Sequence, residues 1–158
     1  MFRLLALFLF LSKQVISQES SDTIYIENKP VTKGYILKYK DSKYGISDPS
    51  DYISVYADNK DVFAIKTGVV KSTFKIDSEN FICIESGDTL MIYGRINTQL
   101  KKGDKIYEGD KIGDLLSESQ NLYMLVLAIT TIREPYTLNY IELEKYITIR
   151  FGRKFKHN

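Results

Sequence analysis

Histidine and cysteine are almost absent from this sequence of 158 residues, which contains one of each. The histidine, His157, stands one residue before the end of the chain. Nucleophile systems of the Ser/His/Asp or Cys/His kind need a positioned base, and a catalytic zinc ion needs about three protein ligands. The scarcity of histidine therefore argues against hydrolytic chemistry of both kinds.

The single cysteine, Cys83, excludes a disulfide within the chain. It lies in the strand-like run "FICIES", where a small buried hydrophobic residue is expected rather than a reactive thiol. Packing alone must then stabilise the fold.

A strong excess of charge of one sign is also missing. The formal net charge is +2, and removal of Arg3 and Lys13 with an N-terminal segment leaves 20 basic against 20 acidic residues. A nearly neutral protein has no general electrostatic attraction to nucleic acid or to anionic membranes. There is no glycine-rich phosphate loop before a helix, and "DNKD" at 58–61 lacks the pattern of a calcium loop, so we expect no cofactor.

Long hydrophobic runs are limited to the N-terminus, where Leu4 to Leu11 are apolar. Such a run rises only about 12 Å as a helix, against roughly 30 Å of bilayer hydrocarbon. Preceded by Arg3 and followed by polar residues and Ser17, it is typical of a signal peptide. We expect residues 1–17 to be cleaved, the protein to be exported to the periplasm or outside the cell, and no membrane span to remain.

Short strand-like runs fill most of the rest, and no amphipathic helix of ten or more residues is evident. "GYILKYK" and "YISVYA" are rich in β-branched and aromatic residues, and "NFICIESGDTLMIYGRI" has the pattern of a hairpin around Ser86-Gly87-Asp88. "NLYMLVLAITTI" predicts a central strand buried on both faces, with a helix as the alternative because an all-apolar run has no distinguishing period. "LNYIELEKYI" predicts a helical turn or a further strand. We predict an all-β fold with a polar lead-in at 18–29, one domain at 30–149, and a basic tail at 150–158.

Two hexads repeat between Leu100 and Lys111, "LKKGDK" and "IYEGDK", and a third begins at Ile112. Each begins with an apolar residue that can point inward and contains a Gly-Asp turn. Turns at Gly103, Gly109 and Gly113 would use positive φ, which glycine adopts without strain, and the Asp can hydrogen-bond the nearby backbone. Gly68, within "DVFAIKTGVVKSTFKI", predicts a break or bulge and a close backbone approach.

Read in order over roughly residues 50–130, these segments resemble the lysostaphin-type (LytM) zinc endopeptidases of bacterial cell walls. That family has V-x-A-x-x-x-G-x-V, matched by "VFAIKTGVV", and then a hairpin ending in Tyr-x-His-Leu. A glycine repeat similar to "LKKGDKIYEGDKIG" follows, and then His-x-His in a strand where this chain has "LYMLVLAI". The resemblance implies a mostly antiparallel β-sandwich or barrel-sandwich hybrid, the duplicated hybrid motif, with a groove across one sheet.

The resemblance also implies that the catalytic residues are replaced. Arg95 stands at the histidine of Tyr-x-His, and Met124 and Val126 stand at His-x-His. A His-x-x-x-Asp element would fall at Pro49 and Ile53, or at Ser50 and Ser54. Arginine stays protonated and cannot act as a base, so we expect a pseudo-enzyme without zinc; an active wall peptidase is the remaining enzymatic alternative.

Two functions without catalysis stay open. In the first, the degenerate groove binds an envelope protein, such as a wall amidase, or a peptidoglycan peptide, through aromatic and Arg side chains. Its expected residues are Tyr52, Tyr56, Tyr93, Arg95, Tyr123, Met124 and Val126. In the second, the chain is a structural subunit of an exported assembly, and a sheet edge makes the contact by strand addition; the alternating segment "KYITIRF" is the candidate edge.

Overall fold

The computed structural model describes residues 22–38, 52–119, 122–132 and 143–152, and the expected signal peptide lies outside these ranges. Their strands form two sheets, and the pairings are antiparallel. The strands are β1 (Asp22–Glu27), β2 (Lys33–Lys38), β3 (Ile53–Ala57), β4 (Asp61–Phe63), β5 (Gly68–Ile76), β6 (Glu79–Ser86), β7 (Thr89–Gly94), β8 (Ile96–Asn97), β9 (Lys105–Ile106), β10 (Lys111–Leu115), β11 (Ser117–Ser119), β12 (Leu122–Thr131) and β13 (Thr148–Gly152). The predicted all-β, antiparallel fold is confirmed.

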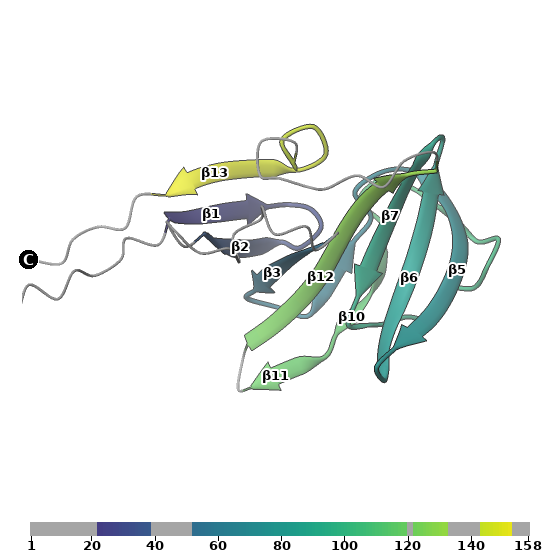
Figure 1. Cartoon of the computed structure of the whole chain (residues 1–158), viewed down its shortest axis with the longest axis horizontal. Coiled ribbons are helices and arrows are strands. Elements are labelled where there is room, and N and C mark those ends of the chain that lie inside the picture. The colour runs from purple at the N-terminus through teal and green to yellow at the C-terminus, as the bar shows by residue number, and fades with distance from the viewer. Residues whose placement is uncertain (1–21, 39–51, 120–121, 133–142, 153–158) are drawn as a thin grey trace, which may run out of the picture.

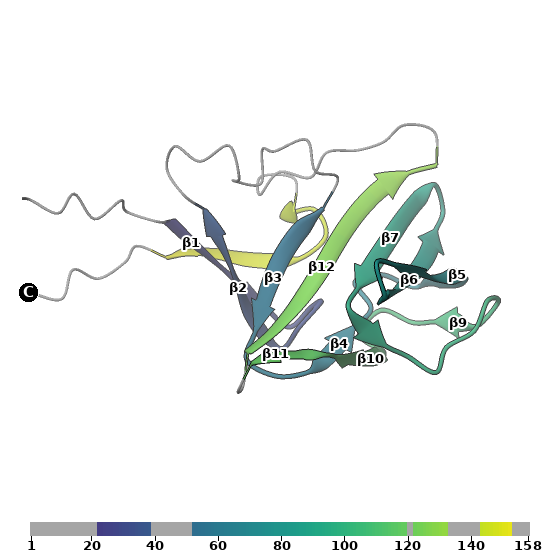
Figure 2. The ribbon, with the colours of Figure 1, turned by 60° about the horizontal axis from the view of Figure 1, so that its bottom comes forward.

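The large sheet has the order β13-β1-β2-β3-β12-β7-β6-β5-β9, with β11 paired to β12, and it curls strongly at the β5–β7 end (Figure 1). The small sheet, β4-β10-β8, lies beneath it (Figure 2). One face of the large sheet packs on the small sheet and forms the core. The fully buried side chains of this core include Ile24, Ile26, Val55, Val62, Ile82, Ile84, Met91, Ile96, Ile112, Leu125 and Leu127.

Strand β12 is the central element, as predicted from its apolar sequence. It pairs with β3 on one side and with β7 on the other. Leu125, Leu127 and Ile129 are buried, whereas the residues between them are partly exposed. Alternation of this kind follows from the two-residue period of a strand. Strand β12 therefore buries one face completely and the other only in part, and the predicted burial of both faces is wrong.

Two hairpins form the curled end of the sheet. Ser86 pairs with Thr89, so the predicted loop contracts to Gly87 and Asp88, and Gly87 has φ +63°. In the preceding hairpin Ile76 pairs with Glu79 around Asp77 and Ser78, which both have positive φ. Positive φ at both central residues is the geometry of a type I′ turn, whose twist matches that of the flanking strands.

The two complete hexads form the same turn twice. Gly103 and Gly109 have φ of +95° and +85°. Asp104 accepts a hydrogen bond from Lys101 N at 2.8 Å, and Asp110 accepts one from Tyr107 N at 2.8 Å. These bonds are the predicted side-chain fixation of the turn.

Each hexad turn is also paired to the segment that contains β4 and β5. Val70 exchanges backbone hydrogen bonds with Gly103 and Asp104, and Ala64 does the same with Gly109 and Asp110. Ala64 and Val70 are six residues apart, and so are the two hexad turns that they bond. The repeat therefore fixes the backbone at both ends of residues 64–70, which comprise the linker 64–67 and the start of β5. Ile106 and Ile112, the first residues of the second and third hexads, are buried.

Glycine has a different role at two predicted turn positions. Gly68 begins β5 after a break in the strand pattern, and an added Cβ would lie 2.3 Å from the Glu85 carbonyl oxygen, as the predicted close approach requires. Gly113 lies inside β10 and not in a turn, so its predicted positive φ is wrong. A Cβ there would lie 2.5 Å from the Asn97 carbonyl oxygen, so a larger residue does not fit at this position.

Two predicted boundaries are also wrong. The lead-in 18–29 contains β1, which pairs with both β2 and β13, and residues 150–152 of the predicted tail belong to β13. The alternation in "DTIYIE" buries Ile24 and Ile26, a signal that the polar flanks obscured. Near the C-terminus, Ile147 N donates to Leu143 O, which gives a helical turn, one of the two alternatives predicted for this segment. Within the described ranges, no helix is long and apolar enough to cross a membrane.

Candidate functional site

The face of the large sheet opposite the core, here called the outer face, carries the positions expected for the site. Met124 and Val126 alternate with the buried Leu125 and Leu127, so both point to the outer face. Both side chains are partly exposed. The sequence spacing of two residues therefore places them side by side on one surface, as a strand requires.

The register brings residues of three strands into one row across the outer face. Val126 lies directly opposite Ser54 on β3 and opposite Gly94 on β7, and Met124 lies opposite Tyr56. Directly opposed residues have Cβ atoms about 4.5–5.5 Å apart. Positions 54, 124 and 126 are thus neighbours on adjacent strands.

The same register chooses between the two placements of the Asp position of His-x-x-x-Asp. Ile53 points into the core and is 3% exposed, whereas Ser54 is on the outer face beside Val126. Pro49 and Ser50 lie outside the described residues. The placement that uses Ser54 is the one compatible with a site on this face.

Beyond Val126 the row continues over aromatic rings. A Cβ on Gly94 would lie 2.3 Å from a ring carbon of Phe81, so this ring covers Gly94. Phe81 stacks on Phe74 of β5, with ring centroids 5.4 Å apart and an interplanar angle of 8°. These rings border a hollow of about 300 Å³ that is also lined by Thr73, Lys75, Asn80, Ile96, Asn97, Thr98 and Leu100.

Arg95 connects β7 to β8 with φ +64°, an uncommon conformation for a residue with a side chain. Only 15% of its side chain is exposed, and its Nε lies 3.0 Å from Oε1 of Glu79. Glu79 belongs to the alternating set of β6 that includes Phe81 and therefore points to the outer face. The Arg95 guanidinium therefore has a carboxylate partner within the chain.

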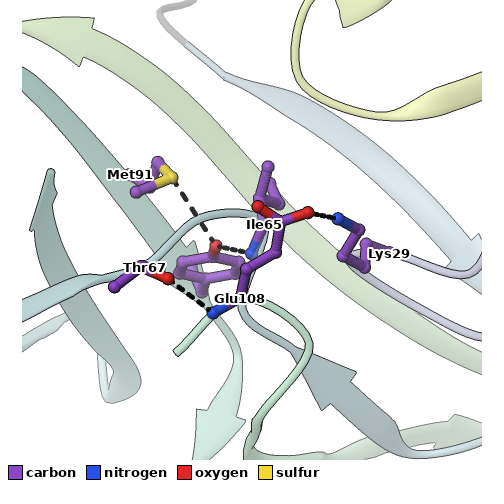
Figure 3. A network of polar contacts seen from close by, with 6 residues as sticks. Lys29, Ile65, Thr67, Met91 and Glu108 are labelled. Atoms are coloured by element: carbon purple, nitrogen blue, oxygen red, sulfur yellow. Dashed lines mark hydrogen bonds and ion pairs between the residues drawn. The ribbon is translucent and has the colours of Figure 1, made fainter. Parts of the chain in front are cut away.

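Tyr93 is buried in the core, contrary to the expectation that it lines a groove. Its exposed fraction is 0%. Its hydroxyl accepts a hydrogen bond from Ile65 N at 2.9 Å and donates to Met91 Sδ at 3.9 Å (Figure 3). Burial raises the pKa of Tyr93. The side chain fixes the 64–67 linker and offers no surface to a partner.

The linker is tied to the second hexad by polar contacts as well (Figure 3). Glu108 N donates to Thr67 Oγ1 at 3.0 Å, and Lys29 forms an ion pair with the Glu108 carboxylate. The hydrogen bond from Lys29 lowers the pKa of Glu108. These contacts support the position of the turn and do not form a reactive group.

The other tyrosines expected at the site, Tyr52, Tyr123 and Tyr56, lie in different environments. Tyr52 is 50% exposed, just before β3. Tyr123 is partly buried and packs against the core, as its alternation with Met124 requires. Tyr56 is on the outer face and stacks on Tyr35, with ring centroids 5.4 Å apart.

Among the residues that the structure describes, the ionisable groups near this face form no metal cage. Cys83 is buried, and desolvation raises the pKa of its thiol, which agrees with the inert role expected for it. Across the described ranges, no three or more His, Cys, Asp or Glu residues are grouped so that they could hold a metal ion.

Sequence reasoning missed the aromatic residues that extend this face, namely Phe74, Phe81, Tyr25 and Tyr35. The sequence did contain a signal for the two tyrosines, because Tyr25 and Tyr35 are each next to a buried isoleucine, in "TIYIE" and "GYILK". Alternation places such tyrosines on the face opposite the core. What the sequence could not supply was the register that lines them up.

Comparison with known proteins gives little further guidance. No family model matches the sequence, and no curated protein matches it. Among solved structures, the crystal structure of CbpA from L. salivarius REN matches with 24% sequence identity and a TM-score of 0.42. The match covers 60% of this chain and 61% of that chain.

Proposed function

We propose that this protein is a catalytically inactive domain of the lysostaphin type that acts as a binding or regulatory module in the bacterial cell envelope. The observation that carries the proposal is the row on the outer face. Val126 lies opposite Ser54 and beside Met124, and the resemblance assigns these three positions to metal and catalytic residues. The closeness of the three positions on one face supports the proposal, although their side chains differ from those of the family.

These side chains do not fit a zinc site. Zinc in proteins is held by imidazole nitrogen, thiolate sulfur or carboxylate oxygen. Val126 supplies no ligand atom, Met124 supplies a thioether, and Ser54 supplies a hydroxyl group. We therefore assign no hydrolytic step to this face.

The same face has the composition of a contact surface. Met124, Val126 and the ring of Phe81 give a partly exposed apolar strip, and the pair of Arg95 and Glu79 borders it. Aromatic residues, Met and Arg are enriched where proteins bind one another. A peptide laid across β3, β12 and β7 would cover the apolar strip and contact the charged pair at its margin.

Incubation with isolated peptidoglycan tests the absence of catalysis. The purified protein, with zinc added, should release no soluble peptide or sugar fragments above a blank. Release that a chelator abolishes would contradict the pseudo-enzyme assignment.

Binding of purified peptidoglycan stem peptides, measured by calorimetry, tests the contact surface. Met124→Ala and Arg95→Ala should each weaken binding, by about tenfold if each removes roughly 1.4 kcal/mol. Lys71→Ala is a matched control, since it removes an ion pair with Glu85 elsewhere on the sheet. Tyr93 is unsuitable for this test because its substitution would open a cavity in the core. Equal binding by all variants would contradict a role for this face.

One observation favours the alternative of a structural subunit. Residues 148–152 of the segment "KYITIRF" form β13, which is the outermost strand of the large sheet beside β1. An outermost strand is a template for strand addition. If partner binding survives Arg95→Ala and Met124→Ala but is lost on proline substitution at Ile149, this edge is the contact.

A further inference from the structure

A row of three tyrosines crosses the N-terminal half of the large sheet. Tyr25 on β1 lies directly opposite Tyr35 on β2, and Tyr35 lies directly opposite Tyr56 on β3. Residues that oppose one another across neighbouring strands project from the same face. All three rings therefore stand on the outer face, in a line perpendicular to the strands; we call Tyr25, Tyr35 and Tyr56 the tyrosine row.

The row is exposed at one end and packed at the other. Tyr25 is 47% exposed, Tyr35 and Tyr56 are partly exposed, and the last two stack with ring centroids 5.4 Å apart. Neighbouring strands are about 4.8 Å apart, so the three ring positions extend over roughly 10 Å. This is the scale of two linked sugar rings.

Polar residues lie alongside the row, each two positions before or after one of the tyrosines along the chain. A hollow of about 330 Å³ is lined by Tyr25 and Tyr35 together with Glu27, Lys33 and Asp58. Glu27 lies opposite Lys33 in the register of β1 and β2. Asp58 is exposed and is positioned by a hydrogen bond from its backbone N to Lys33 O at 3.3 Å.

We propose that the tyrosine row and this hollow bind an extended glycan chain, with a sugar ring laid on the exposed ring of Tyr25, the chain continuing over the edges of the stacked Tyr35 and Tyr56 rings, and hydroxyl groups bound by Asp58, Lys33 and Glu27. A pyranose ring has an apolar face of C–H groups and a rim of hydroxyl groups. Such a ligand needs a flat aromatic surface next to carboxylates and an amine, and small-ligand sites combine apolar walls with a few placed polar groups in this way.

The charge of the hollow selects between ligand classes. Two carboxylates and one ammonium group line it, whereas a nucleic acid would require an excess of Lys and Arg for its phosphates. A proline-rich peptide also binds aromatic grooves, but it docks its prolines between rings. Here Tyr35 and Tyr56 are stacked on each other with an angle of 21° between their planes, which leaves no slot between these two rings.

This inference does not depend on the proposed function. The glycan surface uses β1, β2 and the end of β3, whereas the peptide surface uses Met124 and Arg95. Either can fail without the other, and Tyr25→Ala and Arg95→Ala separate the two experimentally.

Calorimetric titration of the full chain with chitohexaose, a straight β-1,4-linked sugar chain, tests the inference. Tyr25→Ala and Tyr35→Ala should weaken binding about tenfold or more, and Tyr25→Phe should keep most of the affinity because the ring remains. Asp58→Asn should also weaken binding. Tyr107→Ala, at a tyrosine 64% exposed on the second hexad, is the matched control and should bind like the wild type.

Three results would overturn the inference. The first is no heat of binding at millimolar sugar from a wild type that is folded by circular dichroism. The second is equal loss of binding in Tyr25→Ala and Tyr107→Ala. The third is equal or tighter binding of maltohexaose, whose chain is curved, or of a proline-rich decapeptide. Tyrosine fluorescence offers a second readout, because the chain has 12 Tyr and no Trp.

Discussion

At the scale of the residue, Tyr93 shows how one polar atom can stabilise a core. Its hydroxyl is the acceptor for the buried Ile65 N–H. Tyr93→Phe keeps the ring but leaves that N–H without this acceptor, so we expect a loss of about 1–3 kcal/mol in the free energy of unfolding. Urea denaturation measures it. Tyr107→Phe, at an exposed site, should change the stability by less than about 0.5 kcal/mol.

The same residue predicts how stability depends on pH. Burial raises the pKa of Tyr93, whereas in the unfolded chain the phenol ionises near its usual value of about 10. Above that pH the folded state keeps more protons than the unfolded state, so the free energy of unfolding should fall as pH rises. Tyr93→Phe should show a smaller fall between pH 9 and 11; an identical slope in both proteins would contradict the assignment.

Ser78 is a residue whose conformation suits another amino acid better. It has φ +68° at the second central position of the β5–β6 turn. Glycine adopts positive φ without the steric penalty of about 1–2 kcal/mol. Ser78→Gly should therefore raise the thermal midpoint, whereas Ser72→Gly, inside β5, should lower it. Stabilisation by both substitutions would point to a cause other than the turn.

Several individual residues were predictable from the sequence and others were not. Gly103 and Gly109 could be assigned to turns because Gly-Asp chemistry is local. Arg95 could be aligned with the site, but its ion pair with Glu79 depends on how two strands meet. Tyr93 was misplaced because a tyrosine in a strand can face either side, and only the register decides.

At the scale of the element, the glycines of the hexads separate two physical effects. Gly109 has φ +85° and open space where a Cβ would be, whereas Gly113 lacks space and has no positive φ. Gly109→Ala should cost about 1–2 kcal/mol, and Gly109→Asn should cost less because Asn tolerates this conformation. Gly113→Asn should be worse than Gly113→Ala, since the larger side chain meets Asn97. The opposite order at either site, measured by urea denaturation, would contradict these assignments.

The row on β3 and β12 predicts that a metal site can be built on this face. Ser54→Asp, Met124→His and Val126→His together place three ligands on one face of two adjacent strands. The triple variant should bind zinc in equilibrium dialysis, because such side chains can converge on one ion. Met124→His alone is the control. A folded triple variant that binds no more zinc than this control would contradict the proposed geometry.

At the scale of the whole molecule, the first and last strands of the described chain pair with each other at one edge of the large sheet. Thr23 of β1 pairs with Gly152 of β13. A chain ending at Ile147 should lose this pairing, unfold at lower temperature, and associate through the exposed edge of β1. Thermal scans and analytical ultracentrifugation measure both effects. A chain ending at Gly152 is the control and should behave as the full protein does; an unchanged midpoint after removal of β13 would show that this pairing contributes little.

The sequence by itself determined what depends on near neighbours. The alternation of Leu125, Leu127 and Ile129 gave a strand, Gly87 gave a hairpin, and the hexads gave two identical turns, because backbone preferences and short-range hydrogen bonds act within a few residues. The scarcity of histidine, with His157 alone, likewise led to the prediction that the chain carries no histidine-dependent hydrolysis.

The tertiary structure alone decided what depends on register between distant strands. It paired β1 with β13, buried Tyr93, placed Ser54 on the outer face and Ile53 in the core, and aligned Tyr25, Tyr35 and Tyr56 in one row. A shift of one residue in any of these pairings would turn every side chain of that strand to the other face. The core fixes the register because the buried isoleucines must meet on one side, and the composition of the outer face follows from that requirement.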